Sequence, residues 1–439
     1  MSTKRSLWSF LAALIVFSLL ISACGGGATP EPEGDGEPAG PAEDTGVVFI
    51  MGPFRGEEEA AFGTVIAAFE EQNPDIDIVY SGTSEFETLI TVRAEAGDPP
   101  DIAAIPQPGL MKKFAAEGQI VPLWDEVLQL VDQNYAPAWK ELGSYEGTPY
   151  GVFHRVNAKG WIWYNKPEFE AAGFEIPETW DDLMALTEKM IAETDRAPWC
   201  IGIESGAATG WVGTDWLENI MLRTQPVDVY DDWISHDLKF QSDEVRNAWE
   251  IMDSIWMDEE QVYGGPATIA TTDFKDAAAW LFAEPPNCWL HMQGSFVTNF
   301  FPTDVQENLD EKVGVFMMPP IDPELPRTLE VGGDQYVVFK DRPEVRRFVE
   351  FLATGASAEP WAARGGALFP HQDHDTNVYP TAIEKRMAEA ILEAEAARFD
   401  ASDSMDSAVN LAFWKGVTDY VGGKPIDQVL ADIDAAMPE

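Results

Sequence analysis

Aromatic rings and carboxylates in a glycine-rich stretch are the groups of this sequence best suited to bind a small ligand. The segment SGAATGWVGTDW carries Trp211, Asp215 and Trp216 among small residues, and it shows neither a helical nor a strand period. An indole face packs on the apolar face of a small ligand, and carboxylates accept short hydrogen bonds from a ligand's polar groups. A core segment would not place two tryptophans between so many glycines, so we expect these three residues to line a cleft.

Other candidate residues follow the ends of expected strands. Residues 47–51 form a short apolar run, which is typical of a strand buried on both faces, and Phe54 and Arg55 come soon after it. Gln107 has the same position after the strand expected over residues 101–105. Ligands of parallel sheets bind beyond the carboxyl ends of the strands. We therefore expect these three side chains at one cleft.

The elements that must hold these residues alternate between strand and helix. Apolar residues recur with helical spacing from Phe62 to Phe69, which predicts a helix over residues 57–72 that ends at Asn73 before a proline. The same reasoning predicts a strand over 76–80 and helices over 85–96 and 110–117. Such alternation is typical of an α/β fold with a parallel sheet and crossover helices.

The charge of the chain excludes one class of partner. Its 28 lysine and arginine residues face 76 aspartate and glutamate residues, which gives a net charge of −48. Nucleic-acid binding depends on neutralising phosphates with basic side chains, so we expect no nucleic-acid partner. The same field disfavours anionic ligands and leaves a neutral ligand unaffected.

Metal binding and catalysis have weak support. His371 and His374 in PHQDHD have a spacing that can ligate zinc, but Pro370 and Pro380 around them predict a loop rather than an aligning helix. We expect no metal and no cofactor. The G-x-S-x-G, P-loop and H-E-x-x-H patterns are absent, so we expect no enzyme. The many carboxylates leave glycoside hydrolysis by an acid pair as an alternative.

The N-terminus predicts export and anchoring. An apolar run from Leu7 to Ile21 is too short to cross a bilayer as a helix, and the ISAC sequence that ends at Cys24 resembles a lipoprotein lipobox. We expect residues 1–23 to be a signal peptide, Cys24 to carry lipid, and residues 24–46 to be a disordered acidic Gly/Pro tether. The protein would then lie on the outer face of the cytoplasmic membrane. An ordinary signal peptide with an incidental Cys24 is the alternative.

The other two cysteines predict a disulfide. Cys200 and Cys288 are the thiols that remain after Cys24, and an extracytoplasmic location favours their oxidation to one bond. Two isolated cysteines are too few for a structural zinc site, and we do not expect either to be catalytic.

Several ordered motifs resemble a known family. The strand that ends in WYNK is followed by a short helix and by G…P.TWDDL, with AGDPPDIAAIPQPGLM before it and GGDQYVVFKDRPEVRRFVEFL after it. From Val47 onward the chain resembles extracellular solute-binding proteins of the carbohydrate-uptake type, the receptor components of ABC importers. PWCIGIESGAATGWVGTDWLEN, CWLHMQGSF and RFDASDSM followed by FWKG resemble the alpha-glucoside-binding branch most.

The resemblance implies a particular fold. It is an α/β, two-lobed periplasmic-binding-protein fold of the maltose-binding type, with a hinge and a ligand cleft between the lobes. Lobe one would comprise residues 47–157 and 314–354, and lobe two residues 158–313 and 355–439. The chain would cross the hinge near residues 157–160, near 312–315 and near Gly355. The aromatic but aperiodic segment 197–240 would form loops that line the cleft.

The resemblance also implies further site residues. Trp414 in LAFWKG matches a stacking tryptophan on lobe two, and Trp161 and Trp163 lie on the strand beside the hinge, where one of them would face the cleft. Gln293 stands where the family has a glycine followed by an aromatic residue, so Phe296 would be the wall of the cleft here.

Backbone and acidic groups complete the expected site. Glycine at Gly333 lets the backbone approach a ligand, and Asp334 follows it near a lobe junction. Asp400 and Asp403 would reach the cleft from lobe two. For each acid, a helix cap or a surface charge is the alternative role.

The expected function follows from these features. The protein would be a monomeric lipoprotein receptor that captures a neutral sugar, an alpha-glucoside di- or oligosaccharide, and delivers it to the permease of an ABC importer. A secreted glycoside hydrolase is one alternative. A receptor for another neutral solute, such as a polyol or peptide, is a second.

Overall fold

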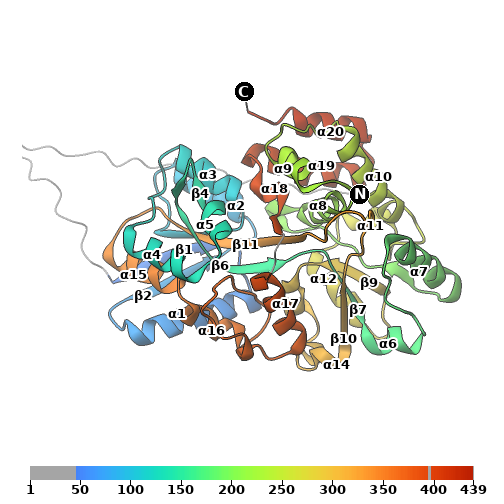
Figure 1. Cartoon of the computed structure of the whole chain (residues 1–439), viewed down its shortest axis with the longest axis horizontal. Coiled ribbons are helices and arrows are strands. Elements are labelled where there is room, and N and C mark those ends of the chain that lie inside the picture. Colours follow the sequence, from blue (N-terminus) through green and yellow to red (C-terminus); the bar gives the residue numbers. More distant parts are fainter. Residues whose placement is uncertain (1–45, 394–396, 439) are drawn as a thin grey trace, which may run out of the picture. The chain divides into compact units, whose positions relative to one another are not determined.

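A computed structural model describes residues 46–393 and 397–438 (Figure 1). The expected signal peptide, the lipid-bearing Cys24 and nearly all of the expected tether lie outside these residues. Among the helices described, none has the length and apolar character needed to cross a membrane.

A six-stranded sheet carries the N-terminal part of the chain. Its strands are β1 (Val47–Gly52), β2 (Asp77–Gly82), β3 (Ile102–Ile105), β6 (Gly151–Ala158), β11 (Leu329–Val338) and β12 (Ala397–Phe399). β1 lies between β2 and β3 and is parallel to both, which confirms the predicted parallel arrangement. β11 runs antiparallel to β3 and β6 and parallel to β12, so the complete sheet is mixed.

Helices cover this first sheet, as Figure 1 shows. They are α1 (Glu57–Gln72), α2 (Phe86–Glu95), α3 (Pro108–Ala116), α4 (Asp125–Asn134), α5 (Pro137–Leu142), α15 (Pro343–Leu352), α16 (Gly355–Ala362) and α17 (Ala382–Glu393). α1 has the predicted bounds, because its apolar stripe Phe62, Val65 and Phe69 is buried while three acids occupy its first turn.

A four-stranded sheet is the second sheet of the fold. Its order is β10 (Val313–Met317), β7 (Trp161–Asn165), β9 (Cys288–Gln293) and β8 (Ala197–Trp199). β7 runs antiparallel to both neighbours, and β8 is parallel to β9. Cys200, just after β8, and Cys288 form a disulfide with a Cα–Cα distance of 5.6 Å, which is the pairing predicted from the sequence.

The remaining described elements are short connections and helices around the second sheet. The helices are α6 (Lys166–Ala171), α7 (Trp180–Glu193), α8 (Trp211–Thr224), α9 (Val227–Ile234), α10 (Asp243–Trp256), α11 (Pro266–Ile269), α12 (Phe274–Ala279), α13 (Thr303–Gln306), α14 (Leu309–Lys312), α18 (Ala401–Ser404), α19 (Ser407–Val421) and α20 (Ile426–Asp434). The 3-10 helices are η1 (Gly206–Ala208), η2 (Trp280–Phe282), η3 (Ser295–Phe300) and η4 (Thr376–Val378), and β4 (Ser144–Tyr145) pairs with β5 (Thr148–Pro149).

The chain passes between the two sheets more than once. It leaves the first sheet after β6 and enters the second at β7, at the predicted position near Gly160. Residues 313–317 pair in the second sheet and 397–399 in the first, which differs from the lobes to which the sequence assigned most of them. α16 packs on α1, beside the first sheet. Apolar runs do not reveal which sheet a strand joins, so the predicted lobe boundaries stay a prediction.

The segment 197–240 is not a set of loops, contrary to the expectation. Most of it forms β8, α8 and α9. Gly210 stands at the N-cap of α8 with a φ of 115°. A Cβ added at Gly213 would lie 3.0 Å from Trp256 Cη2, so this glycine permits close helix packing. The glycines of this segment begin a helix and permit a close helix contact, and from the sequence alone we mistook them for glycines of a loop.

Candidate ligand-binding site

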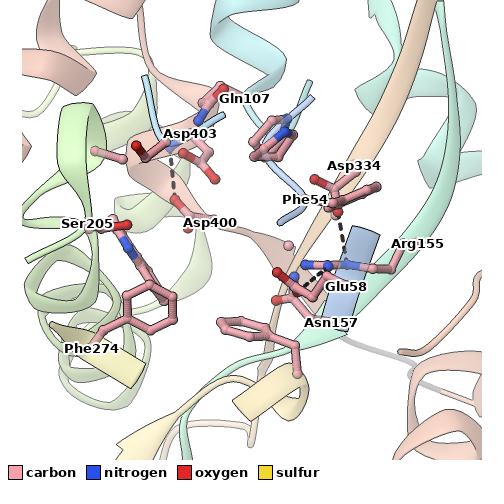
Figure 2. Close-up of a pocket in the computed structure, with 18 of the residues that line it drawn as sticks. Phe54, Glu58, Gln107, Arg155, Asn157, Ser205, Phe274, Asp334, Asp400 and Asp403 are labelled. Carbon is pink, nitrogen blue, oxygen red and sulfur yellow. Dashed lines mark hydrogen bonds and ion pairs between the residues drawn. The ribbon is translucent and has the colours of Figure 1, made fainter. Parts of the chain in front are cut away.

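A cleft of about 960 Å³, with the part open to solvent included, lies where segments of both sheets converge. We call it the main cleft. It is lined by the turns after β1, β2 and β3, by β6 and β11, and by residues of η1, α8, α12, η3, α18 and α19. Figure 2 shows polar side chains entering it from opposite sides, with Arg155 and Asp334 across from Asp400 and Asp403.

Many of the residues predicted from the sequence line this cleft. They are Phe54, Arg55, Gln107, Trp211, Phe296, Gly333, Asp334, Asp403 and Trp414, and Asp400 joins them. The first three reach it as expected, because the turns after β1 and β3 open at the same edge of the first sheet.

Other predicted residues lie behind the cleft or in the core. Trp163 and Trp216 are buried among apolar side chains, and the Trp163 indole donates to the carbonyl of Gln293 at 3.0 Å. Trp161, Gln293 and Asp215 are also absent from the lining. Trp211 and Trp216 are not separated by a whole number of helical turns, so they lie on different faces of α8. Trp216 packs against Trp199 and Trp256.

One charged cluster stands on the first sheet. Arg155 on β6 and Asp334 on β11 are register partners, with 3.0 Å between the guanidinium Nε and a carboxylate oxygen. Arg155 also donates to Glu58 Oε1 at 2.6 Å, and its guanidinium lies 4.8 Å from the ring centre of Phe54. Figure 2 shows both ion pairs. The cation is therefore held rigidly between two carboxylates and an aromatic face.

A second charged cluster surrounds Lys159 between β6 and β7. Its ammonium contacts Asp215 Oδ1 at 2.7 Å and also binds Asp400. Glu218 and Glu330 stand close by, so the cluster holds more carboxylates than cations. Ser402 N donates to Glu218, and Asn219 donates to Glu330. These contacts tie the crossing between the sheets to α8, β11 and α18.

Burial sets the protonation of these groups. It raises the pKa of Asp215 to about 7 although Lys159 pulls it down, and it raises the pKa of Asp334 to about 6 against the effect of Arg155. Burial, assisted by the charge of Asp400, also raises the pKa of Asp403 well above its usual range. Burial alone would raise the pKa of Asp400, but Lys159 holds it below its usual value. Burial thus favours the neutral form of Asp403, whereas Lys159 favours the charged form of Asp400.

An aromatic wall faces these charges. The Trp211 ring centre lies 5.2 Å from that of Phe274 and 5.8 Å from that of Phe296. Phe300 extends the wall, and Trp414 closes the cleft from α19. Such rings provide the apolar faces on which a sugar ring stacks.

The sequence reasoning missed several residues of the lining. They include Glu58, Glu87, Arg155, Asn157, Lys159, Ser205, Phe274 and Lys275. Arg155, Asn157 and Lys159 alternate along the GVFHRVNAKG segment, and this period-two pattern of polar side chains was a usable signal for one face of a strand. Glu58 lies in the first turn of α1, where acidic residues are common because they stabilise the helix N-terminus. Its type therefore gave no sign of a ligand site.

Comparison with known proteins identifies the family. The model of the family "Bacterial extracellular solute-binding protein" matches residues 55–359. The chain belongs to this family. The fold class predicted from the sequence is thereby confirmed, and the protein is a solute-binding receptor located outside the cytoplasm.

Two curated relatives match nearly the whole receptor. It is 40% identical over 431 residues to the osmoprotective compounds-binding protein GgtB of Synechocystis sp., covering 98% of this chain and 99% of the relative. It is 40% identical over 397 residues to the alpha-glucosides-binding periplasmic protein AglE of Rhizobium meliloti, covering 88% and 86%.

Solved structures share the fold at low identity. The bacterial solute receptor AcbH matches with a TM-score of 0.78 and 17% identity, covering 89% of this chain and 97% of that one. A chitin oligosaccharide binding protein matches with a TM-score of 0.76 and 16% identity, covering the same shares.

Proposed function

We propose that the protein is a lipid-anchored receptor that captures a neutral alpha-glucoside, a di- or oligosaccharide, and delivers it to the permease of an ABC importer. The observation that carries this proposal is the neutralisation of both buried cations at the main cleft. Arg155 has two carboxylate partners, and Lys159 has two as well. An anionic ligand would have to compete with these acids, whereas a neutral one leaves the pairs intact.

The lining supplies the two kinds of group that a sugar needs. Trp211, Phe296 and Trp414 offer flat apolar faces, and Gln107, Asn157 and Asp403 offer polar atoms. The Asn157 Oδ1 atom is buried without a hydrogen-bond partner among the described residues, so it is available to a ligand hydroxyl. The name of one relative at 40% identity, an alpha-glucosides-binding periplasmic protein, supports this class of solute.

Capture follows the hinge mechanism expected of two lobes around a cleft. A sugar that contacts Arg155 from one side and Asp403 from the other stabilises the closed arrangement. It shifts an existing equilibrium only by its greater affinity for the closed state. The lipid on Cys24 would keep the receptor near its permease and raise its effective concentration there.

A thermal-shift panel with maltose, trehalose, sucrose, sugar alcohols and amino acids tests the ligand class. A ligand present at 100 times its Kd stabilises the fold by roughly 2.7 kcal/mol. We expect one of the sugars to raise the melting temperature and to be recovered intact. Release of monosaccharide would instead support a hydrolase, and stabilisation only by amino acids would overturn the proposal.

A polyol is the second candidate ligand. The observation that favours it is the relative named for osmoprotective compounds, which covers almost the full chain. The same panel separates the two, because only a polyol receptor is stabilised by sugar alcohols in preference to glucosides.

A further inference from the structure

A second cavity lies beside the main cleft, between α2, α3 and α19. Its volume is about 720 Å³ when the part open to solvent is included. Glu87, Gln107 and Trp414 line both spaces, so these three side chains form a partition between them. We call this space the second cavity. Figure 2 shows Gln107, one of these three residues, near Asp403 at the main cleft.

Polar atoms at the partition are buried and lack partners. Gln107 Nε2 donates to Glu87 Oε1 at 3.1 Å, and Asn410 Nδ2 donates to Asp403 Oδ1 at 3.3 Å. Each amide thereby has its NH₂ group fixed on an acid and its carbonyl oxygen left over. Within the described chain, Gln107 Oε1, Asn410 Oδ1 and Trp414 Nε1 have no hydrogen-bond partner, and their side chains are at least nine-tenths buried. Leaving such groups unpaired is costly.

These atoms match the chemistry of a hydroxyl group. A hydroxyl donates one hydrogen bond and accepts others, so hydroxyl groups can satisfy both the amide oxygens and the Trp414 indole N–H. Glu87 and Asp403 each already accept a hydrogen bond from one of the two amides. The partition is therefore suited to a ligand that crosses from one space to the other and carries hydroxyls at the crossing.

The surface of the second cavity is mainly apolar, although several of its lining residues are polar. Val92 on α2, Leu110 on α3 and Leu411 on α19 line it, and the first and last of these are 55% and 50% exposed. The Lys113 ammonium at its rim lies 4.0 Å from Glu95, so its charge has a partner. These walls favour a neutral group with a C–H-rich surface.

We propose that the second cavity is an extension of the main cleft that takes the distal, C–H-rich end of a neutral glucoside. This inference rests on the proposed function and narrows it to glucosides longer than a disaccharide or with an apolar aglycone. The first one or two sugar units would occupy the main cleft, and hydroxyls would meet Gln107, Asn410 and Trp414. Only a further sugar ring or an aglycone would lie against Val92 and Leu411.

Filling the second cavity tests this inference. Thr91→Trp places a large ring in the cavity from α2, and Leu411→Trp does so from the opposite wall. Leu89→Trp is the matched control, because Leu89 is on α2, is 39% exposed and lines neither space. Calorimetric titrations would compare maltose and methyl alpha-glucoside with maltotriose and hexyl alpha-glucoside, and melting of the ligand-free variants would check their folding.

We expect the filled variants to bind the longer ligand about tenfold or more weakly, the scale of losing roughly two buried methylene groups. Their affinity for the short ligand should stay within about twofold, and Leu89→Trp should match the wild type. Loss for maltotriose alone identifies a further sugar ring as the occupant, and loss for the hexyl compound alone identifies an aglycone.

Two results would overturn the inference while the proposed function stands: equal affinities for short and long ligands in all variants, or an equal loss for both lengths in the filled variants. A wild-type protein that binds none of these glucosides would refute the proposed function, and the extension with it.

Discussion

Lys159 and Asp215 form a buried ion pair at the point where the chain passes from the first sheet to the second. The ammonium and the carboxylate oxygen are 2.7 Å apart, and both side chains are almost fully buried. Asp215 belongs to α8 and Lys159 follows β6, so the pair connects the strand crossing to the helix that carries Trp211. A residue predicted to bind ligand thus acts behind the cleft, where it holds a cleft residue in place.

The first prediction concerns pH and Asp215→Asn. Burial raises the pKa of Asp215 to about 7, against about 3.9 in an unfolded chain. The folded state therefore holds the extra proton, and the stability linked to Asp215 is present below about pH 4 and is lost as pH rises through about 7. Asp215→Asn has no carboxyl group at this position and does not lose this stability. The free energy of unfolding of the variant minus that of the wild type should therefore increase as pH rises between those values.

Denaturant unfolding of both proteins at several pH values measures that difference. The comparison is necessary because burial lowers the pKa values of His291 and His371 to about 4, which changes stability with pH in the opposite direction. These histidines are present in both proteins and cancel. A difference that is constant across the range would show that Asp215 does not titrate there.

The second prediction separates two tryptophans. Trp211 is partly exposed at the cleft, whereas Trp414 is only 3% exposed. Trp211→Ala should weaken sugar binding by roughly 1.5–3 kcal/mol, about 10- to 150-fold in Kd, with little loss of ligand-free stability. Trp414→Ala should lower both, because truncating a buried tryptophan costs roughly 3–5 kcal/mol of stability. Trp249→Ala in the core is the control, with a stability loss alone.

Measuring affinity and ligand-free melting on the same samples tests both placements. A Trp211→Ala protein that melts far below the wild type yet binds sugar normally would show that the indole belongs to the core.

How far the sequence predicts this molecule depends on whether a feature is local. The helix of residues 57–72 was predicted with its observed bounds, because its apolar stripe, acidic first turn and following Asn-Pro are all local signals. The prediction of a loop where α8 begins was wrong, because Gly213 permits a close contact with Trp256, which lies far along the chain. A glycine that permits helix packing has the same sequence appearance as a glycine in a loop.

The site shows the same limit. Phe54 and Gln107 could be placed because the ends of parallel strands share an edge. The alternation of Arg155 and Lys159 predicts that they share one face of a strand, but their burial could not be predicted. Buried cations are stable only next to partners such as Asp334 and Asp400, and those partners are some 180 and 240 residues away. Pairing across such distances in the chain leaves no local pattern.

The third prediction concerns the disulfide. Replacing Cys200 and Cys288 together by alanine should lower the free energy of unfolding by roughly 2–5 kcal/mol, because the bond restricts the unfolded chain. Neither cysteine lines the main cleft, so sugar affinity at a temperature where the variant is folded should match the wild type. Urea titrations of the oxidised wild type and the variant give the difference, and coincident curves would argue against a stabilising bond.

The fourth prediction concerns anchoring. Cys24→Ser removes the thiol expected to carry lipid, so the exported protein should move from the membrane fraction to the soluble one. Because the cleft is built from residues 53–414, sugar affinity should not change. Fractionation of cells that express each protein provides the measurement. A variant that remains firmly membrane-bound would refute the lipoprotein assignment.

The most direct test of the central claim is a calorimetric titration of the wild-type protein with trehalose, maltose and sucrose, each beside its phosphorylated counterpart. If the main cleft binds a neutral sugar, at least one unmodified sugar should bind with one-to-one stoichiometry. Its phosphorylated form should bind at least about tenfold more weakly, since the buried cations already have carboxylate partners. Binding of the phosphorylated sugar as tightly as the neutral one, or of no sugar at all, would contradict the account.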